Sequence, residues 1–260
     1  MKILLVVYDN DSHISWFPQG LSYIAAVLRQ HGYEIEIYNQ DWHHYPDSHL
    51  TQYLDEHKFD VIGVSVIGGY YQYRKLNSLS QAINASKQRP FYIIGGHGPS
   101  PDPEFFLKKT KADVVVMGEG EVTIVELLEA LGSKKSLNHV NGIAFRDGDT
   151  VVINEPRPLI KDIDTIPFPA YDLFPVEYHR LMRIIPYLKP SEFVMPVLTG
   201  RGCKFQCNFC YRMDKGLRIR KNEAIIEEIK YLKQQYNIRG FLFSDELLMT
   251  SLPNPPRRIR

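Results

Sequence analysis

All the cysteines of this chain lie within residues 203–210. Cys203, Cys207 and Cys210 follow the spacing C-x3-C-x2-C, which can bring three thiolates to one side of a loop, where they can share a metal centre. An ordinary [4Fe–4S] cluster takes four cysteines, so a cluster bound here has one iron without a protein ligand. An open coordination position is typical of a catalytic metal and not of a structural one.

Three other interpretations of the cysteines are weaker. A structural zinc site needs four ligands, and here no histidine follows Cys210 and C-x3-C is an unusual zinc spacing. Inert, buried cysteines explain poorly why three lie so close together, directly after Gly200-Arg201-Gly202. A disulfide scaffold is disfavoured because the number of cysteines is odd and the chain is large.

The surroundings of the cysteines extend the pattern. An aromatic residue, Phe209, precedes the last cysteine, Thr199-Gly200-Arg201-Gly202 stands before the first, and Tyr211-Arg212 follows. This segment resembles the signature of the radical S-adenosylmethionine (SAM) family. The resemblance implies that the cysteines hold a [4Fe–4S] cluster, that its open iron binds the amino and carboxylate groups of SAM, and that an electron from the cluster cleaves SAM to a 5′-deoxyadenosyl radical. It also implies a small-molecule substrate and an electron donor of the flavodoxin or ferredoxin type.

Composition limits the setting of this chemistry. The chain has 260 residues, enough for one large or two ordinary domains, and 44% of them are hydrophobic. A net charge of +1 gives no general argument for nucleic acid as a partner. The apolar run Ile3–Val7 is too short for a signal peptide or a membrane span, and no other segment is long and apolar enough to cross a bilayer. Free, clustered cysteines suit a reducing compartment, so we expect a cytoplasmic protein without a membrane span.

Residues 1–132 alternate strand and helix patterns. The continuous apolar run Ile3–Val7 predicts a strand that is buried on both faces. Four more strands are predicted at 34–38, 61–66, 91–94 and 114–117, and helices at 18–30, 49–57, 71–86, 103–109 and 122–131. These repeats predict an α/β domain with a five-stranded, doubly wound parallel sheet of the flavodoxin or Rossmann type.

Glycines stand at the ends of three of these strands. In such folds ligands bind beyond the carboxyl ends of the strands, and glycine lets backbone approach a ligand closely. Ordinary tight turns are the alternative, but three glycine turns at one edge favour a ligand site. The candidate residues are Ser65, Gly68, Gly69, Gly95, Gly96, His97, Gly118, Glu119 and Gly120.

The same loops suggest a ligand. Gly95-Gly96-His97, Gly118-Glu119-Gly120-Glu121 and the helix start Pro18-Gln19-Gly20-Leu21 resemble the cobalamin (B12)-binding domain found in front of radical SAM domains. The resemblance implies that cobalamin binds against 65–69, 95–97 and 118–121. Many B12 domains carry D-x-H-x-x-G, whose histidine ligates cobalt, but Asp11-Ser12-His13 lacks the following glycine. We therefore do not expect His13 to be a cobalt ligand, and radical SAM relatives often bind cobalamin without one.

Residues 133–192 are expected to connect two domains. Val140–Phe145 and Thr150–Asn154 flank Asp147-Gly148, which is a strong hairpin signal. Prolines then accumulate and predict an extended, rigid linker. The stretch 162–174 resembles the linker of the two-domain family.

Residues 193–250 begin a second βα series. We expect a strand over 193–198, a helix with Asn222 as N-cap, and a strand over 240–243. That strand ends in Ser244, Asp245 and Glu246. These residue types suit a helix cap, whereas the family resemblance implies that this edge contacts the SAM amino group.

This second series is expected to be an incomplete radical SAM domain, the start of a partial (β/α) barrel, followed by a disordered tail over 251–260. The resemblance implies methyl transfer to an unreactive carbon or phosphorus. A radical cyclase or rearrangement enzyme, and a non-catalytic cobalamin or iron–sulfur binding protein, remain alternatives. A nucleotide-binding domain with an unrelated metal loop is weaker, since no G-x-G-x-x-G follows the first strand. The substrate and the catalytic residues stay open.

Overall fold

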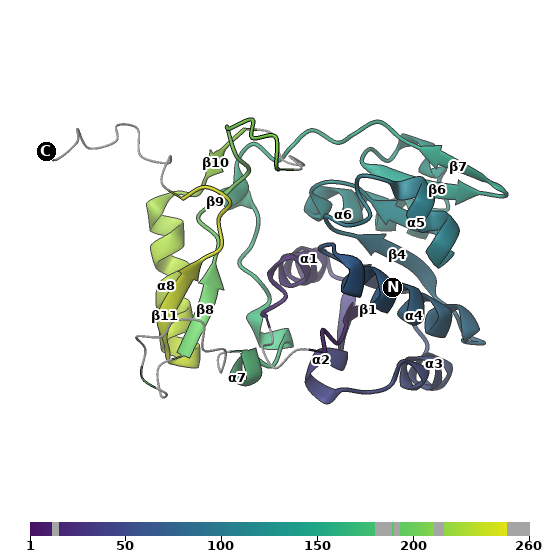
Figure 1. Cartoon of the computed structure of the whole chain (residues 1–260), viewed down its shortest axis with the longest axis horizontal. Helices are drawn as coiled ribbons and strands as arrows, with labels where there is room; N and C mark the ends of the chain where they lie inside the picture. The colour runs from purple at the N-terminus through teal and green to yellow at the C-terminus, as the bar shows by residue number, and fades with distance from the viewer. Residues whose placement is uncertain (12–15, 180–188, 190–192, 211–215, 249–260) are drawn as a thin grey trace, which may run out of the picture. The chain divides into compact units, whose positions relative to one another are not determined.

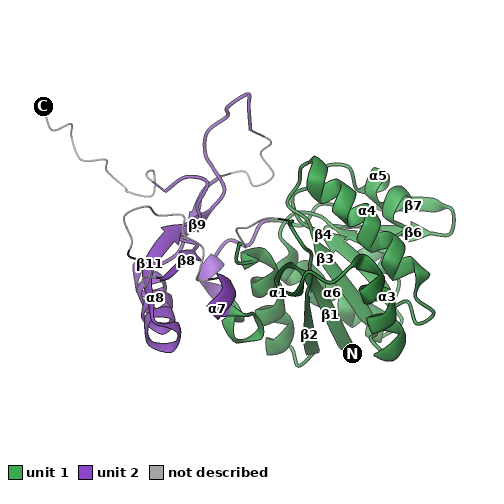
Figure 2. Cartoon of the chain, turned by 60° about the horizontal axis from the view of Figure 1, so that its bottom comes forward, with its two compact units in different colours: residues 1–158, 167–175 green, residues 159–166, 176–260 purple. Residues whose placement is uncertain are grey.

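The chain forms two compact units (Figure 2). The computed structural model describes residues 1–11, 16–179, 189, 193–210 and 216–248. The first unit comprises residues 1–158 and 167–175, and the second comprises 159–166 and the residues from 176 onward. Residues that the sequence singled out but that lie outside the described part are His13, Tyr211, Arg212 and the tail 251–260.

A seven-stranded sheet forms the centre of the first unit (Figure 1). Its strand order is β2-β1-β3-β4-β5-β6-β7, and β1 to β5 are parallel. The five predicted parallel strands are thus confirmed. The strands are β1 Lys2–Val7, β2 Glu34–Asn39, β3 Val61–Ser65, β4 Phe91–Gly95, β5 Val114–Val116, β6 Ile143–Asp147 and β7 Thr150–Ile153.

The predicted hairpin is present, but it lies in this sheet and not in the connector where we expected it. Its first strand, β6, pairs antiparallel with β5, so that Phe145 lies opposite Val114 and Ile143 opposite Val116. Ile143, Ala144 and Phe145 are buried. The physical reason is that an uncovered β5 would leave a hydrophobic edge strand exposed to water.

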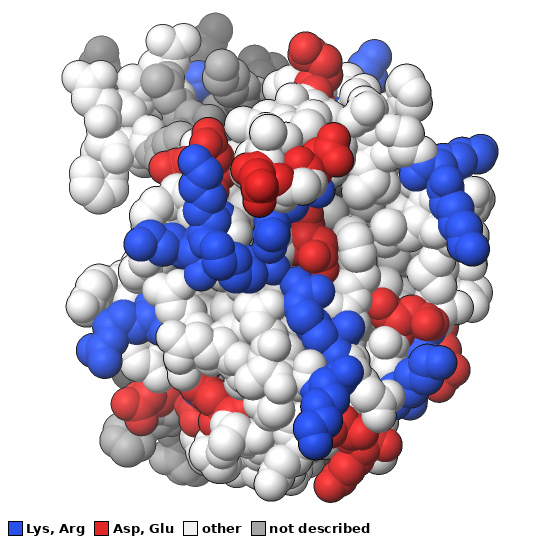
Figure 3. Space-filling view, turned by 90° about the vertical axis from the view of Figure 1, so that its right-hand side faces the viewer, with Lys and Arg blue, Asp and Glu red and all other residues white. Residues whose placement is uncertain are grey.

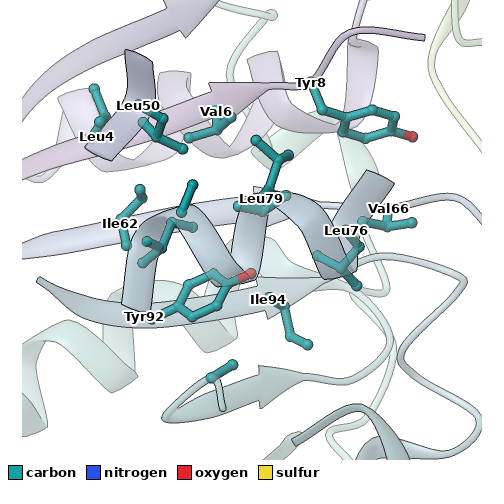
Figure 4. Close-up of a cluster of buried hydrophobic side chains, with 14 of the residues drawn as sticks. Leu4, Val6, Tyr8, Leu50, Ile62, Val66, Leu76, Leu79, Tyr92 and Ile94 are labelled. Atoms are coloured by element: carbon teal, nitrogen blue, oxygen red, sulfur yellow. The ribbon is translucent and has the colours of Figure 1, made fainter. Parts of the chain in front are cut away.

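Helices cover both faces of the sheet. On one face, Leu50 of α3 and Leu76 and Leu79 of α4 pack against strand residues such as Ile62 and Ile94 (Figure 4). On the other face α1 and α6 lie together. The helices are α1 Gln19–Gln30, α2 Gln40–His43, α3 Asp47–Glu56, α4 Tyr70–Ala85, α5 Pro103–Thr110 and α6 Gly120–Gly132, with a 3-10 turn at Leu137–His139. Among the described residues, no helix has both the length and the apolar content that a bilayer crossing requires.

Part of the proline-rich segment folds back onto the first unit and does not run as an extended linker. A 3-10 turn at Tyr171–Leu173 places the Tyr171 ring against Phe17, with ring centroids 5.2 Å apart. The Ala170 amide donates to the Ser22 carbonyl at 3.0 Å. Arg29 forms an ion pair with Asp172 at 2.6 Å. Aromatic burial therefore overrides the extended preference that the prolines predict.

The second unit contains the predicted strand–helix–strand series. The strand β8 Phe193–Val197 pairs in parallel with β11 Ile238–Phe243, and α8 Asn222–Tyr236 connects them. Asn222 is the first helical residue and not the predicted N-cap, because the preceding Lys221 takes that position and its amide donates to Asp164 at 2.8 Å. Four short elements were not predicted: η2 Ile163–Thr165, α7 Val176–His179, β9 Gly200–Arg201 and β10 Arg218–Ile219.

Candidate cofactor sites

The cysteine loop has a closed base. Strands β9 and β10 pair antiparallel, with Gly200 opposite Ile219 and Arg201 opposite Arg218. A Cβ on Gly200 would lie 2.9 Å from the Arg218 carbonyl oxygen, so glycine is what lets the two strands approach. The chain therefore leaves β8, forms the cysteine loop and returns to the same point before α8 begins.

All three thiols are free. Cys207 and Cys210 are exposed and Cys203 is partly exposed, and the Cys210 amide lies 3.4 Å from the Cys207 carbonyl oxygen. Phe209, between them, is 97% exposed. In the part of the chain that the structure describes, no three His, Cys, Asp or Glu side chains are grouped as metal ligands. The donor set fits an iron–sulfur cluster in type and accessibility, and binding must draw the sulfurs together, as is usual when metal binding is coupled to folding.

Asp245 lies two residues after the end of β11 and holds the start of the cysteine segment. Its Oδ1 accepts the backbone amides of Thr199 at 2.7 Å and Gly200 at 2.8 Å, and its Oδ2 accepts the Thr199 hydroxyl. The expectation of a helix cap at Ser244–Glu246 is wrong for Asp245, since the described residues after it are not helical and its carboxylate is bonded to the other strand. The predicted contact of this edge with SAM stays a prediction.

A second side chain holds the same segment from its carbonyl side. Arg220 is buried, and it donates from Nη1 to the Leu198 carbonyl at 2.8 Å and pairs with the fully buried Glu228 of α8. The Arg220 amide donates to the Thr199 carbonyl at 2.9 Å. Arg220 and Glu228 were not predicted from the sequence. The available signal was a carboxylate at position 228, three residues after Ile225 and so on the apolar face of α8, where charged residues occur only when paired.

The predicted glycine loops of the first unit share one edge. They follow β3, β4 and β5, which are neighbours in the sheet, so the structure brings them together as expected. Backbone bonds join the first two loops: Val66 donates to the Gly95 carbonyl at 2.9 Å, and Gly98 donates to the Val66 carbonyl at 3.0 Å. Gly96 has φ +96°, and a Cβ there would lie 2.4 Å from the Val66 carbonyl oxygen. Gly96 is therefore needed for loop packing.

One glycine of this edge, Gly118, faces open space. Gly118 has φ +71° and a Cβ there would meet nothing within 4 Å. Gly68 and Gly69 also have positive φ, at +142° and +108°. Ser65, Gly95, Glu119 and Gly120 are partly buried and His97 is exposed. Large side chains stand beside them, with Ile67 74% and Tyr70 76% exposed. Exposed apolar side chains next to open backbone suit a large, mostly apolar ligand.

A polar group at the end of β1 was not predicted. The strand order reverses between β1 and β3, which is where such folds bind ligands. Asp9 Oδ2 lies 2.9 Å from His44 Nδ1, and the Tyr71 hydroxyl donates to the Asp9 carbonyl at 3.3 Å. The hydrogen bond with Asp9 raises the pKa of His44 above its usual value. Burial raises the pKa of Tyr8 to about 12, so its phenol is neutral.

Charge is mixed on one face of the molecule. On the face that Figure 3 shows, Lys and Arg side chains lie next to Asp and Glu side chains. Ion pairs of the first unit include Arg89 with Asp113 at 2.8 Å and Lys75 with Asp47 at 2.6 Å. This mixture agrees with the net charge of +1.

Comparison with known proteins shows what the chain is similar to. Residues 2–128, which contain the parallel sheet, match the family described as B12 binding domain. Together with the relatives below, this match confirms the predicted resemblance to radical SAM proteins that carry a B12-binding domain.

Curated relatives include methyltransferases and a cyclase. The chain is 30% identical over 257 residues to an uncharacterized methyltransferase of Pyrococcus horikoshii, covering 95% of this chain and 53% of that protein. It is 28% identical over 293 residues to cytidylyl-2-hydroxyethylphosphonate methyltransferase of Streptomyces wedmorensis, covering 94% and 54%. It is 26% identical over 241 residues to the anaerobic magnesium-protoporphyrin IX monomethyl ester cyclase of Rubrivivax gelatinosus, covering 89% and 42%. The chain thus spans about half the length of these relatives.

Solved structures confirm the fold class. The cobalamin-dependent radical SAM enzyme OxsB, with aqua-cobalamin and SAM bound, matches with a TM-score of 0.76 and 21% identity, covering 98% of this chain and 35% of that one. The radical SAM methyltransferase TsrM of Kitasatospora setae, with cobalamin and a [4Fe–4S] cluster bound, matches with a TM-score of 0.70 and 20% identity, covering 94% and 47%. Cobalamin, SAM and the [4Fe–4S] cluster, the cofactor set predicted from the sequence, are present in these relatives.

Proposed function

We propose that this chain is part of a cobalamin-dependent radical SAM enzyme that transfers a methyl group to an unreactive carbon. The observation that carries the proposal is the loop of three free thiols, held at the carboxyl end of β8, in a chain whose other unit matches a B12-binding domain. Neither feature alone specifies the chemistry. Their presence in one chain is what distinguishes this class from an iron–sulfur carrier or a simple cobalamin carrier.

The cysteine loop has a binding and an orienting task. Cys203, Cys207 and Cys210 supply three thiolates, and the absence of a fourth cysteine in the chain leaves one iron position for SAM. A bound cluster supplies the electron that cleaves SAM. The exposure of Cys207 and Cys210 gives SAM access to that side of the loop. Ser244 and Glu246, which follow β11, are the proposed contacts for the amino group of SAM. Asp245 lies between them in the sequence.

The first unit has the task of holding cobalamin. The loops after β3, β4 and β5 are assigned to the corrin ring. Gly118 leaves room for it, Gly68 and Gly69 take positive φ in the loop after β3, and Ile67 and Tyr70 offer apolar surface. Cobalamin supplies a carrier for the methyl group. A small-molecule substrate, a flavodoxin- or ferredoxin-type reductant and a cytoplasmic location complete the proposal, since three free thiols need a reducing compartment.

Anaerobic reconstitution with iron, sulfide and hydroxocobalamin tests this function. We expect about four irons per chain and one bound cobalamin, read by metal analysis and absorbance. Changing any one of Cys203, Cys207 and Cys210 to Ala removes the iron and leaves cobalamin binding intact. Lys204→Ala is the matched control, because it alters the same loop and keeps all three thiols. Stoichiometric zinc with no uptake of iron would contradict the proposal.

A radical cyclase is the second candidate, favoured by the similarity to the Rubrivivax gelatinosus cyclase. The two reactions differ in the fate of the SAM methyl group. With methyl-labelled SAM, reduced cobalamin and dithionite, methyl transfer chemistry puts the label on cobalamin. A cyclase releases it as labelled methionine, so label found only in methionine would favour the second candidate.

A further inference from the structure

Among the described residues, the hydrogen bonds of the Asp245 carboxylate all go to the chain just before the cysteine loop. The amides of Thr199 and Gly200 share Oδ1, and the Thr199 hydroxyl takes Oδ2. Asp245 lies 46 residues from Thr199 in sequence, so this contact joins the ends of two parallel strands. Hydrogen bonds to an ionised carboxylate are about twice as strong as neutral ones.

The opposite side of the same segment is also fixed. Arg220 binds the Leu198 carbonyl through its side chain and the Thr199 carbonyl through its backbone amide. Gly200 cannot accommodate a Cβ, because the Arg218 carbonyl lies 2.9 Å from where it would be. Residues 198–200 are therefore held through amides, carbonyls and a side-chain hydroxyl, three residues before Cys203.

We propose that Asp245 is a positioning residue for the cysteine loop. Its carboxylate sets the direction in which the chain leaves β8, and thereby where the Cys203 thiolate lies. This inference rests on the proposed function and deepens it, because it separates Asp245 from the neighbouring residues proposed to contact SAM. Three donors already take three of the roughly four lone-pair sites of the carboxylate, which leaves it little capacity for an ammonium group.

Isosteric variants separate positioning from direct SAM binding. Asp245→Asn removes the charge but keeps an oxygen that accepts the two amides, and its new amide group can donate to the Thr199 hydroxyl. Asp245→Ala removes every contact. Thr199→Val removes only the hydroxyl bond, and Thr199→Ser keeps it. A SAM ligand would be sensitive to Asp245→Asn and indifferent to Thr199→Val, whereas a positioning residue shows the reverse order.

The first readout needs no cofactor. In the full chain without iron, hydrogen exchange at the Thr199 and Gly200 amides is measured for each variant. We expect Asp245→Ala to speed exchange at both amides by about 10-fold or more, the loss expected for hydrogen bonds to a charged group. Thr199→Val gives a smaller change in the same direction, and Asp245→Asn gives a smaller one still, because it keeps all three partners and loses only the charge. Thr199→Ser stays near wild type, and Glu227→Ala on the exposed side of α8 is the control. Unchanged exchange in Asp245→Ala would overturn the proposal.

The second readout uses the reconstituted cluster. The electron paramagnetic resonance spectrum of the reduced chain is recorded with and without SAM. We expect Asp245→Ala and Thr199→Val to broaden the cluster signal already without SAM, while Asp245→Asn keeps a wild-type signal and its response to SAM. A normal Thr199→Val signal together with a lost SAM response in Asp245→Asn would assign Asp245 to SAM binding and overturn the proposal.

The two proposals fail in different ways. If the wild-type chain takes up no iron, the proposed function fails, while the exchange measurement still decides whether Asp245 holds Thr199 and Gly200. If the wild-type chain binds iron and all variants match it in both readouts, only the positioning role fails. Should Asp245→Ala not fold, Thr199→Val carries the decision, because it removes one bond and no charge.

Discussion

A Cβ placed on Gly96 would lie 2.4 Å from the carbonyl oxygen of Val66. The two residues belong to the loops after β4 and β3, and Gly98 donates to the same carbonyl at 3.0 Å. The close approach of the loops therefore depends on a missing side chain. This separates two roles that glycine can have at a ligand-binding edge, namely packing of the protein on itself and space for the ligand.

The Gly96–Val66 contact predicts a loss of stability. Gly96→Ala adds a side chain at φ +96° and against Val66, and we expect it to lower the free energy of unfolding of the first unit by about 3 kcal/mol. Urea unfolding followed by tryptophan fluorescence reports on this unit alone, because Trp16 and Trp42 are the only tryptophans in the chain. Stability within about 0.5 kcal/mol of wild type would show that the loops move apart at little cost.

Gly118 predicts a loss of binding without a loss of fold. Its φ of +71° is one that Asn tolerates, and an added side chain there meets open space. We expect Gly118→Asn to keep the fold and to weaken hydroxocobalamin binding at least about 10-fold, as a polar side chain fills space assigned to the corrin. Equilibrium dialysis measures the affinity.

The hairpin turn offers a matched control for Gly118. Gly148 also has a left-handed φ, +59°, and open space around it. Because β6 runs antiparallel to β5, Gly148 lies at the opposite end of the sheet. Gly148→Asn should leave cobalamin affinity unchanged. Equal affinity in both variants would mean that Gly118 is only a turn residue.

Residue pattern predicts the parallel sheet well, because strands that are buried on both faces appear in the sequence as continuous apolar runs. The run Ile3–Val7 is apolar throughout, and β1 is buried accordingly. The one-turn helix α2, in contrast, is too short for periodicity, and the Asn39 side chain that accepts the Trp42 amide at 3.0 Å gives only a local signal. The hairpin was recognised from Asp147-Gly148, but its pairing with β5 is a long-range contact that local pattern does not encode.

In the candidate site, too, some features follow from local residue pattern and others depend on long-range contacts. The cysteines were found from spacing alone, since their chemistry depends on residue type. The task of Asp245 depends on a hydrogen bond to Thr199, 46 residues away, and on the register of β8 against β11. The sequence placed polar groups at that strand end correctly, but it contained no information on which of them turn toward the neighbouring strand.

The buried pair of Arg220 and Glu228 predicts a large stability effect in the second unit. Glu228 has no exposed surface, and its partner Arg220 is nearly as buried. Glu228→Ala leaves the guanidinium with Asp164, whose carboxylate is 3.7 Å away. We expect the free energy of unfolding of the second unit to fall by about 3 kcal/mol, the usual result of removing one partner of a buried ion pair.

Hydrogen exchange of α8 amides in increasing urea reports on this unit. Glu227→Ala is the control, since it shortens the adjacent, exposed carboxylate of the same helix. Glu228→Gln keeps an acceptor for Arg220, so its loss of stability should be smaller than that of Glu228→Ala. Equal exchange in Glu228→Ala and Glu227→Ala would show that the ion pair adds nothing to the stability of the unit.

The pair formed by Asp9 and His44 predicts a pH dependence at the end of β1. The hydrogen bond with Asp9 is the largest cause and raises the pKa of His44. Burial opposes it, and the charges of Asp9, Asp41 and Asp11 raise the pKa further. Because the pKa of His44 is raised in the folded state, the pair of protonated His44 and the Asp9 carboxylate stabilises the fold fully at pH values below the usual histidine pKa of 6.5. That contribution is lost as pH rises through the higher, folded-state pKa.

Nuclear magnetic resonance titration of the His44 ring measures this effect, with His44→Gln used to assign the signal. We expect Asp9→Asn to lower the pKa of His44 toward its usual value, because the charged acceptor is replaced by a neutral one. Asp147→Asn, at the opposite end of the sheet, should leave the pKa of His44 where it is in the wild type. Since Asp9 and His44 lie where the strand order reverses, bound hydroxocobalamin should also shift this titration if the ligand covers that edge. A His44 pKa that is the same in wild type and Asp9→Asn would show that the hydrogen bond does not persist in solution.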